Sequence, residues 1–174
     1  MWEGLVEVYT GDGKGKTTCA FGLALRALGR GKKVIIFQFI KSISSPSGEV
    51  IALKKAFPEL EIIPGGMGRF IIGEPTEEDL SLAKNLYNRI LLTVSSGKYD
   101  MVIADEIFPA YRAGLISLGE VIELINKKSA GTELVLTGRG APEEIIRLAH
   151  LVTEMKKIKH PYEQGIKARI GIEY

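Results

Sequence analysis

A glycine-rich segment near the start of the chain, TGDGKGKTT at residues 10–18, constrains the fold more than any other feature. It follows directly on LVEV at residues 5–8, an apolar run of strand length. Gly11, Gly13 and Gly15 allow the backbone to curl and to aim successive N–H groups at an anion. The order of strand, glycines, lysine, hydroxyl and helix predicts a phosphate-binding loop.

The side chains of this loop indicate that it binds a nucleoside triphosphate together with a metal ion. In such a loop the lysine reaches the phosphate oxygens and the hydroxyl residue after it binds Mg²⁺. Lys16 and Thr17 occupy these two positions. Thr10 stands where the GxxxxGK[ST] pattern has glycine, and the alternative is a glycine-rich turn with a surface lysine. The residues expected to bind phosphate are Gly11, Asp12, Gly13, Lys14, Gly15, Lys16, Thr17 and Thr18.

Apolar runs of strand length alternate with stretches of helical period along the chain, as in a parallel sheet covered by helices on both faces. Strands are expected at residues 5–10, 34–40, 60–63, 101–105 and 133–137, with one or two more after Leu151. Helices are expected at residues 16–28, 49–55, 77–94, 118–126 and 142–148. We predict one α/β domain over residues 1–174, a three-layer P-loop NTPase-like (RecA-like) fold with a mainly parallel central sheet.

A pair of acids follows the predicted strand at residues 101–105. Asp105 and Glu106 stand where P-loop proteins keep the carboxylate that holds magnesium. A helix cap is the alternative for such a pair. Together with Thr17, the two acids predict a Mg²⁺ site, and Glu106 could also activate water, as the corresponding acid does in many ATPases.

Composition excludes several classes of protein. A net charge of +2 is too small to indicate nucleic acid, and the N-terminus MWEGLVEV resembles neither a signal peptide nor a membrane span, so we expect a cytoplasmic protein. The one cysteine, Cys19, excludes an internal disulfide and is expected to be a packing residue. Neither His150 nor His160 is a convincing general base by itself.

Several segments after the glycine loop narrow the function. Together with that loop, they resemble the CobA/CobO (BtuR) type of ATP:corrinoid adenosyltransferase, the cob(I)yrinic acid a,c-diamide adenosyltransferase family. The resemblance runs from the first strand to the last residue and is specific, because these segments serve no general phosphate-binding purpose. The matching segments are FQFIK (37–41), Gly48 with Glu49, LTGRGAP (136–142), LVTEM (151–155) and KHPYEQGIKARIGIEY (159–174).

The resemblance implies transfer of the 5′-deoxyadenosyl group of MgATP to Co(I) of a reduced corrinoid, cob(I)alamin or cob(I)yrinic acid a,c-diamide, with release of triphosphate. Co(I) carries its own electron pair and no proton, so this reaction needs no general base. The site must neutralise the triphosphate and hold C5′ in line with cobalt, for which Lys16 and Glu106 are the expected catalytic residues. In the family the nucleotide lies reversed in the loop, an arrangement with which Thr10 is compatible.

Other residues have weaker assignments. Arg139 is expected to reach phosphate or ribose oxygens, with a surface arginine as the alternative. Glu49 and Phe70 are candidate corrinoid or ribose contacts, with a helix first turn and a core residue as their alternatives. Relatives usually have a tryptophan after the strand expected at residues 34–40 and the aromatic cluster FTW after the strand expected at residues 60–63. The matching stretches at residues 41–49 and 65–72 contain Phe70 as their one aromatic residue.

The resemblance also implies a homodimer and a separate reductase, such as a flavoprotein, that donates the electron to Co(II). No membrane or nucleic-acid partner is expected. Two other functions remain open at this point: a P-loop ATPase or kinase that releases ADP, and a non-enzymatic module that binds nucleotide, corrinoid or nucleic acid. The basic stretch MKKIKH at residues 155–160 is the feature that would favour nucleic acid. Product analysis with ATP and reduced cobalamin separates these classes.

Overall fold

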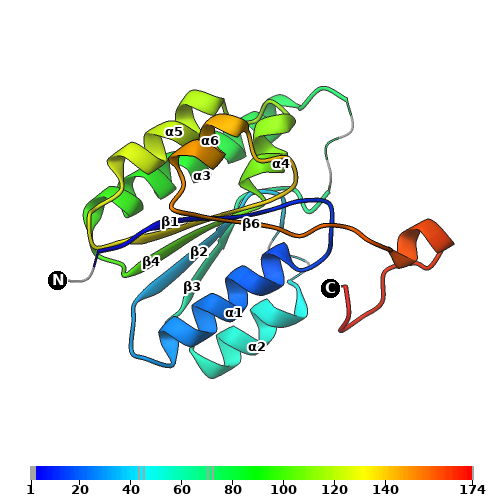
Figure 1. The fold of residues 1–174 in the computed structure, drawn as a ribbon, viewed down its shortest axis with the longest axis horizontal. Helices are drawn as coiled ribbons and strands as arrows, with labels where there is room; N and C mark the ends of the chain where they lie inside the picture. The colour runs from blue at the N-terminus through cyan, green and yellow to red at the C-terminus, as the bar shows by residue number, and fades with distance from the viewer. Residues whose placement is uncertain (1–2, 43, 45, 70, 72, 174) are drawn as a thin grey trace.

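The computed structural model describes residues 3–42, 44, 46–69, 71 and 73–173. Six strands of this part form one sheet in which all neighbours are parallel, in the order β3-β2-β4-β5-β1-β6 (Figure 1). Parallel strands end at a common edge, so the residues that follow β1 and β4 meet there with only β5 between them. The strands are β1 (Val6–Thr10), β2 (Val34–Gln38), β3 (Glu61–Pro64), β4 (Met101–Asp105), β5 (Glu133–Thr137) and β6 (Leu151–Glu154).

Helices cover both faces of this sheet and give three layers, as Figure 1 shows. One face carries α1 (Lys16–Leu28) and α2 (Gly48–Ala56). The opposite face carries α3 (Glu77–Ser96), α4 (Ile107–Arg112), α5 (Leu118–Lys127) and α6 (Glu143–Leu148). A 3-10 turn, η1 (Pro161–Gln164), lies in the C-terminal segment beyond the sheet. The α/β class predicted from the sequence is confirmed.

The core follows from the strand period of two. In β2, Ile35 and Phe37 pack into the cluster under α3 and α5, whereas Val34 and Ile36 pack into the cluster under α1. Both faces of the strand are therefore apolar, which explains why it is a continuous hydrophobic run rather than an alternating one. Each such side chain contributes about 1.5–3 kcal/mol when it is fully buried.

The structure corrects several element boundaries. Strand β2 ends at Gln38, two residues early, because the carbonyls of Ile40 and Lys41 accept hydrogen bonds from glycines at 66 and 68 rather than from a ladder partner. Helix α6 has Pro142 as its N-cap and not as its first helical residue. Helix α4 was not predicted, because it is short and contains Pro109. That proline occupies the first turn, where a backbone N–H has no intrahelical partner to lose.

The expected packing role of Cys19 is wrong, because its side chain is exposed while Ala20 and Phe21 pack against the sheet. Helix α3 begins with a capping box, in which the side chains of Thr76 and Asp79 each accept a hydrogen bond from the backbone N–H of the other. No helix in the described ranges is both long and apolar enough to cross a membrane.

Candidate functional site

The loop between β1 and α1 needs its glycines for two different reasons. Gly11 and Gly15 have φ of 97° and 118°, a region that residues with a Cβ rarely adopt. At Gly13 the limit is space, because a Cβ there would lie 2.5 Å from the carbonyl oxygen of Met155. The alternating glycines thus serve backbone conformation and close approach to the segment that follows β6.

That segment braces the loop. The N–H of Gly13 donates to the Met155 carbonyl at 2.6 Å, and the N–H of Met155 donates to the Thr10 carbonyl at 2.8 Å. We had expected successive glycine N–H groups to face an anion, and this is wrong for Gly13, whose N–H is bound to Met155. The brace joins the first and last strands of the chain at the point where phosphate is expected.

Thr10, the departure from the loop pattern, has a structural use. Its buried hydroxyl accepts a hydrogen bond from the N–H of Ala141 at 3.1 Å. This contact ties the end of β1 to the turn that carries Arg139, in which Gly138 and Gly140 both have positive φ. Glycine at position 10 has no side chain with which to make the contact.

Lys16 and Thr17 open helix α1 and point to neighbouring polar groups. The Lys16 ammonium is buried and donates to the carbonyl of Gly13 at 2.6 Å. Burial, and then the positive charge of Arg139, lower the pKa of Lys16. The Thr17 hydroxyl donates to Asp105 Oδ1 at 2.8 Å, so the loop and the end of β4 form one site.

Asp105 is fully buried and accepts three side-chain hydrogen bonds. Its Oδ1 accepts from the hydroxyls of Thr17 and Thr137, the latter at 2.7 Å, and its Oδ2 accepts from Gln38 Nε2 at 3.1 Å. Burial raises the pKa of Asp105, and the three donors act in the opposite direction. Sequence reasoning missed Gln38 and Thr137. The available signal was a polar residue at the carboxyl end of each apolar strand, β2 and β5.

Glu106 has an unusual backbone. It is the one non-glycine residue in the described ranges with positive φ, at φ 59° and ψ 31°, and it is the N-cap of α4. Its N–H donates to the Thr137 hydroxyl at 3.0 Å, which helps to hold this conformation. Burial, and then repulsion from Asp105, raise the pKa of Glu106 to about 7. Strained backbone of this kind concentrates at functional sites.

The oxygen atoms gathered here suit Mg²⁺. No group of three or more His, Cys, Asp or Glu side chains that could hold a metal occurs among the described residues. Magnesium does not require one, because it usually keeps water and substrate phosphate oxygens beside one or two carboxylates. Since Thr17 donates its proton to Asp105, the lone pairs of its hydroxyl oxygen remain available to a cation. The donor set of Thr17, Asp105 and Glu106 therefore fits the ion.

A cavity of about 80 Å³ opens beside Glu106, lined also by Ile40, Lys41, Gly68 and Arg69. Ligand pockets usually have about 300–1,000 Å³, so this space is too small to enclose a corrin ring. Lys41, which sequence reasoning did not assign to the site, carries a positive charge near both Asp105 and Glu106.

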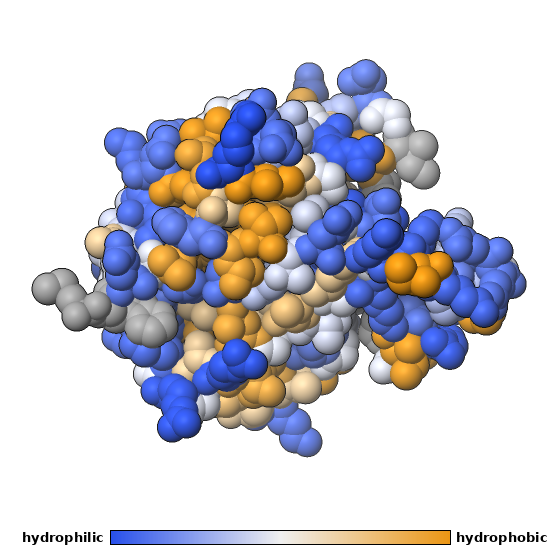
Figure 2. Space-filling view, viewed as in Figure 1, coloured by the Kyte–Doolittle hydropathy of each residue, from blue (hydrophilic) through white to orange (hydrophobic). Residues whose placement is uncertain are grey.

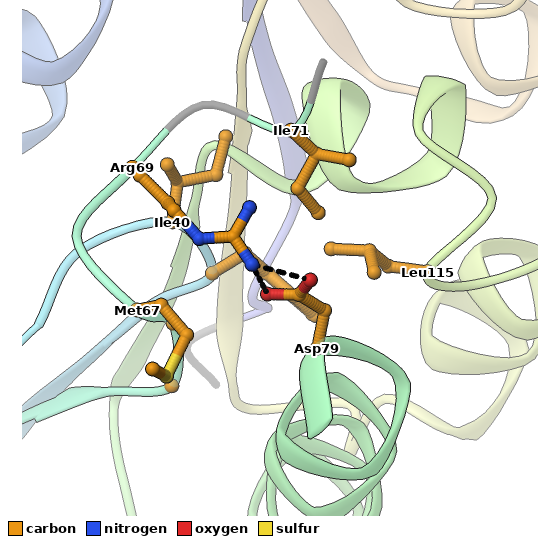
Figure 3. A pocket seen from close by; sticks show the side chains of 9 residues that line it. Ile40, Met67, Arg69, Ile71, Asp79 and Leu115 are labelled. Carbon is orange, nitrogen blue, oxygen red and sulfur yellow. Dashed lines mark hydrogen bonds and ion pairs between the residues drawn. The ribbon is translucent and has the colours of Figure 1, made fainter. Parts of the chain in front are cut away.

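Arg69 also fixes the segment beside this cavity. Its Nη2 donates to Asp79 Oδ2 at 2.9 Å and to Oδ1 at 3.2 Å, across a narrower pocket (Figure 3). In Figure 3, Ile71 and Leu115 point into the same pocket. The ion pair thus ties the 65–69 segment to the start of α3.

The remaining predicted residues make none of the hydrogen bonds described above. Arg139 is exposed on its turn, and Asp12 and Thr18 are exposed on the loop and helix α1. Glu49 lies in the first turn of α2, and Phe70 lies outside the described residues.

Both histidines accept backbone hydrogen bonds away from the loop. The Nδ1 of His150 accepts from the N–H of Val6, and the Nδ1 of His160 accepts from the N–H of Tyr162. Neither contact belongs to the site around Asp105.

Comparison with known proteins agrees with this geometry. A family model described as ATP:corrinoid adenosyltransferase BtuR/CobO/CobP matches residues 2–174. The chain is 35% identical over 171 residues to a corrinoid adenosyltransferase of Escherichia coli (strain K12), covering 98% of this chain and 86% of that protein. It is 34% identical over 171 residues to corrinoid adenosyltransferase CobA of Salmonella typhimurium (strain LT2), with coverage of 98% and 86%.

Solved structures show the same fold at low sequence identity. A KaiC-like protein from Pyrococcus horikoshii OT3 superposes with a TM-score of 0.62 at 18% identity, covering 91% of this chain and 75% of that chain. This likeness concerns the fold alone, whereas the family match and the named relatives concern the whole sequence. The chain belongs to the ATP:corrinoid adenosyltransferase family.

Proposed function

We propose that this chain transfers the 5′-deoxyadenosyl group of MgATP to the Co(I) centre of a reduced corrinoid, cob(I)alamin or cob(I)yrinic acid a,c-diamide, and releases triphosphate. ATP and a corrinoid are the substrates that family membership implies. The observation that carries the proposal is the hydrogen bond from Thr17 to buried Asp105. This bond joins the glycine loop to the acids after β4, so that the two segments can form one binding site for a triphosphate and a cation.

The proposed reaction needs carboxylates and lysines around the triphosphate but no general base. The electron pair of Co(I) attacks C5′ and forms the cobalt–carbon bond, while the C5′–O bond breaks and its electrons leave with the triphosphate. Cobalt passes formally from Co(I) to Co(III), and no proton moves. The protein must therefore stabilise the charge on the leaving oxygen and hold the two reacting atoms in line.

The residues divide this work. The loop from Gly11 to Thr18 holds the triphosphate, and the Lys16 ammonium exchanges the carbonyl of Gly13 for a phosphate oxygen. Arg139 is close enough to Lys16 to influence its pKa, which supports a role for Arg139 at phosphate or ribose oxygens.

Thr17, Asp105 and Glu106 would hold Mg²⁺, which supplies positive charge to the leaving triphosphate when it is bound. We assign Glu49 and Phe70 to the corrinoid or ribose, on the resemblance of the surrounding segments to the family.

Two partners complete the proposal. The active unit is a homodimer, and a reductase such as a flavoprotein supplies the electron to Co(II). Light scattering of the purified chain tests the first, with a monomer at working concentration as the contradicting result. The second is tested by replacing the chemical reductant with a reduced flavoprotein and following Co(II) consumption.

The reaction itself is tested by product stoichiometry. With Mg²⁺, ATP and cob(I)alamin under anaerobic reduction, we expect a light-sensitive cobalt–carbon species and triphosphate in equal amounts. A hydrolase that uses Glu106 on water would release ADP and phosphate without any corrinoid, because water attacks the γ-phosphorus rather than C5′. The proposal would be falsified if ADP formed at one rate with and without reduced corrinoid, and no triphosphate appeared.

A further inference from the structure

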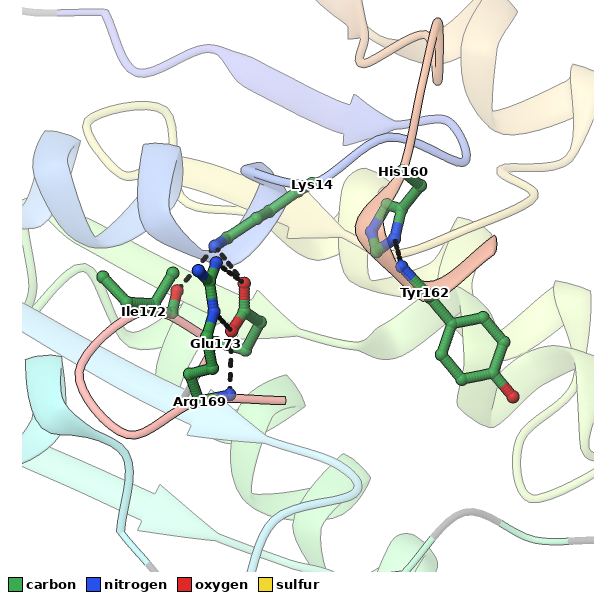
Figure 4. Close-up of polar contacts among 6 residues, drawn as sticks. All are labelled: Lys14, His160, Tyr162, Arg169, Ile172 and Glu173. Carbon is green, nitrogen blue, oxygen red and sulfur yellow. Dashed lines mark hydrogen bonds and ion pairs between the residues drawn. The ribbon is translucent and has the colours of Figure 1, made fainter. Parts of the chain in front are cut away.

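The C-terminal segment leaves the sheet after Met155 and then returns to the phosphate loop. Every residue from 161 to 173 is exposed, and Figure 2 shows this part as a mainly hydrophilic lobe beside the body. Its return point is Lys14, whose ammonium donates to the carbonyl of Ile172 at 2.6 Å and to Glu173 Oε1 at 3.1 Å (Figure 4). A segment with little buried surface is therefore joined to the loop by polar contacts.

The carboxylate in this contact is firmly ionised. The backbone N–H of Arg169 donates to Glu173 Oε2 at 2.8 Å, and the Arg169 guanidinium donates to both carboxylate oxygens. These bonds hold the pKa of Glu173 at about 2. In Figure 4, Lys14 and Arg169 both point toward the same carboxylate. The negative charge of Glu173, 159 positions further along the chain, is thus bound to a lysine of the phosphate loop.

A triphosphate presents several negative charges to the same loop. Two of the three N–H groups of Lys14 already donate to Glu173 and to the Ile172 carbonyl, which leaves one for a phosphate oxygen. A phosphate at Lys14 is also repelled by the negative charge of Glu173. The exposed ion pair is weak, because the Lys14 and Glu173 side chains keep 48% and 22% of their accessible surface. The contact is therefore one that a polyphosphate can replace.

We propose that residues 166–173 form a displaceable strap, in which Glu173 holds Lys14 until the triphosphate of ATP takes the place of the carboxylate. The strap rests on the proposed function in that it requires ATP to bind at this loop. It restrains nucleotide entry by competition of like charges, and it couples ATP binding to release of the C-terminal segment. The relevant partner is the ATP triphosphate itself.

The first test measures ATP affinity without corrinoid. Glu173→Gln keeps the shape of the side chain and removes the competing charge, so the Kd for MgATP should fall about 1.5- to 5-fold at low ionic strength. This difference should shrink as salt is added. The control is Glu163→Gln, which removes a carboxylate of the same segment that pairs with Lys157 and not with the loop; its Kd should equal that of the unaltered chain.

A double substitution isolates the contact. In a Lys14→Met background, Glu173→Gln should leave the Kd for MgATP unchanged, because the cation for which the two anions compete is gone. An improvement of the same size in both backgrounds would overturn the proposal. So would an unchanged or higher Kd for Glu173→Gln alone.

The second test follows the strap directly. Trypsin binds several residues of extended backbone around the bond that it cleaves, so MgATP, by releasing the strap from Lys14, should accelerate cleavage after Lys167 and Arg169. Cleavage after Lys157, which lies before the strap, serves as the internal reference. Glu173→Gln should be cleaved rapidly with or without ATP. Equal cleavage of the unaltered chain in both conditions, or protection of Arg169 by ATP, overturns the strap.

The two proposals fail differently. Both strap experiments contain no corrinoid, so a chain that binds ATP and loses the strap but makes no cobalt–carbon product contradicts the adenosyl transfer alone. A chain that makes the product while Glu173→Gln leaves ATP affinity and cleavage unchanged contradicts the strap alone. Failure of every variant to bind ATP would overturn both.

Discussion

Replacing Thr137 with valine removes one buried hydroxyl while preserving the shape of the side chain. That hydroxyl donates to Asp105 Oδ1 at 2.7 Å and accepts the N–H of Glu106 at 3.0 Å. Valine can do neither, so Asp105 keeps two of its three donors and the strained Glu106 loses the partner of its N–H. Thr137 is therefore a positioning residue that acts on both acids at once.

The magnitude follows from these two contacts. A hydrogen bond to a charged group contributes about 1.5–3 kcal/mol, and a buried N–H left without a partner costs about 1–3 kcal/mol. An added methyl group returns about 1 kcal/mol, so Thr137→Val should lower the free energy of unfolding by about 2–5 kcal/mol. At about 2–4 °C per kcal/mol for a chain of this size, Tm should fall by roughly 4–20 °C. Thr137→Ser keeps the hydroxyl and should lose about 1 kcal/mol.

The assay combines thermal unfolding with a Mg²⁺ titration of ATP binding. A control is Thr132→Val at the opposite end of β5, where a buried hydroxyl donates to the neutral carbonyl of Tyr99 at 2.9 Å. We expect this control to lose stability but to require the same Mg²⁺ concentration as the unaltered chain, whereas Thr137→Val should require more. Equal Tm and equal Mg²⁺ requirement for the valine and serine variants at position 137 would refute the reasoning.

Three further predictions concern the loop and helix α3. Lys16→Ala should weaken MgATP binding about 10- to 150-fold, because it removes a charged donor to phosphate; calorimetry with comparable affinity in the variant would contradict the assignment. Gly13→Ala places a Cβ 2.5 Å from the carbonyl oxygen of Met155, so both Tm and ATP affinity should fall, and preserved values would show that the brace yields. Hydrogen bonds from Thr76, aided by Arg69, lower the pKa of Asp79, so its contribution to stability is present above the ordinary carboxyl pKa and is lost as pH falls through the lowered value. Between about pH 5 and about pH 2, the free energy of unfolding measured in urea should therefore fall less for Asp79→Asn than for the unaltered chain. The same dependence on pH in both proteins would contradict this.

Local patterns predicted much of the fold. Strands β4 and β5 begin and end where the sequence indicated, because each is an apolar run bounded by polar or turn residues. The end of β2 at Gln38 was not predictable in this way, since Phe39 and Ile40 continue the apolar run and only tertiary hydrogen bonds to the 65–68 segment stop the strand. Periodicity cannot report a contact with a distant segment.

The site divides along the same line. Lys16 and Thr17 belong to a local motif, and Asp105 follows an apolar strand, so residue type and spacing were enough to place them together. Gln38 and Thr137 bond the same carboxylate from positions 67 and 32 residues away, and their place at the carboxyl ends of β2 and β5 does not by itself name Asp105 as their partner. The strand order decides which side chains reach the buried carboxylate. The sequence pattern predicts the fold class but not the strand order, so such supporting residues could not be predicted.

The brace between Gly13 and Met155 also sets the order of events during synthesis. The glycine loop leaves the ribosome before most of the sheet, and the strand that holds it in place, β6, comes after the other five strands. Until β6 pairs with β1, the nascent loop is a glycine-rich turn with high conformational entropy and no fixed shape for a phosphate. ATP can therefore stabilise, by mass action on the native state, only a chain in which β6 has been made, and earlier nascent intermediates must fold without help from the nucleotide.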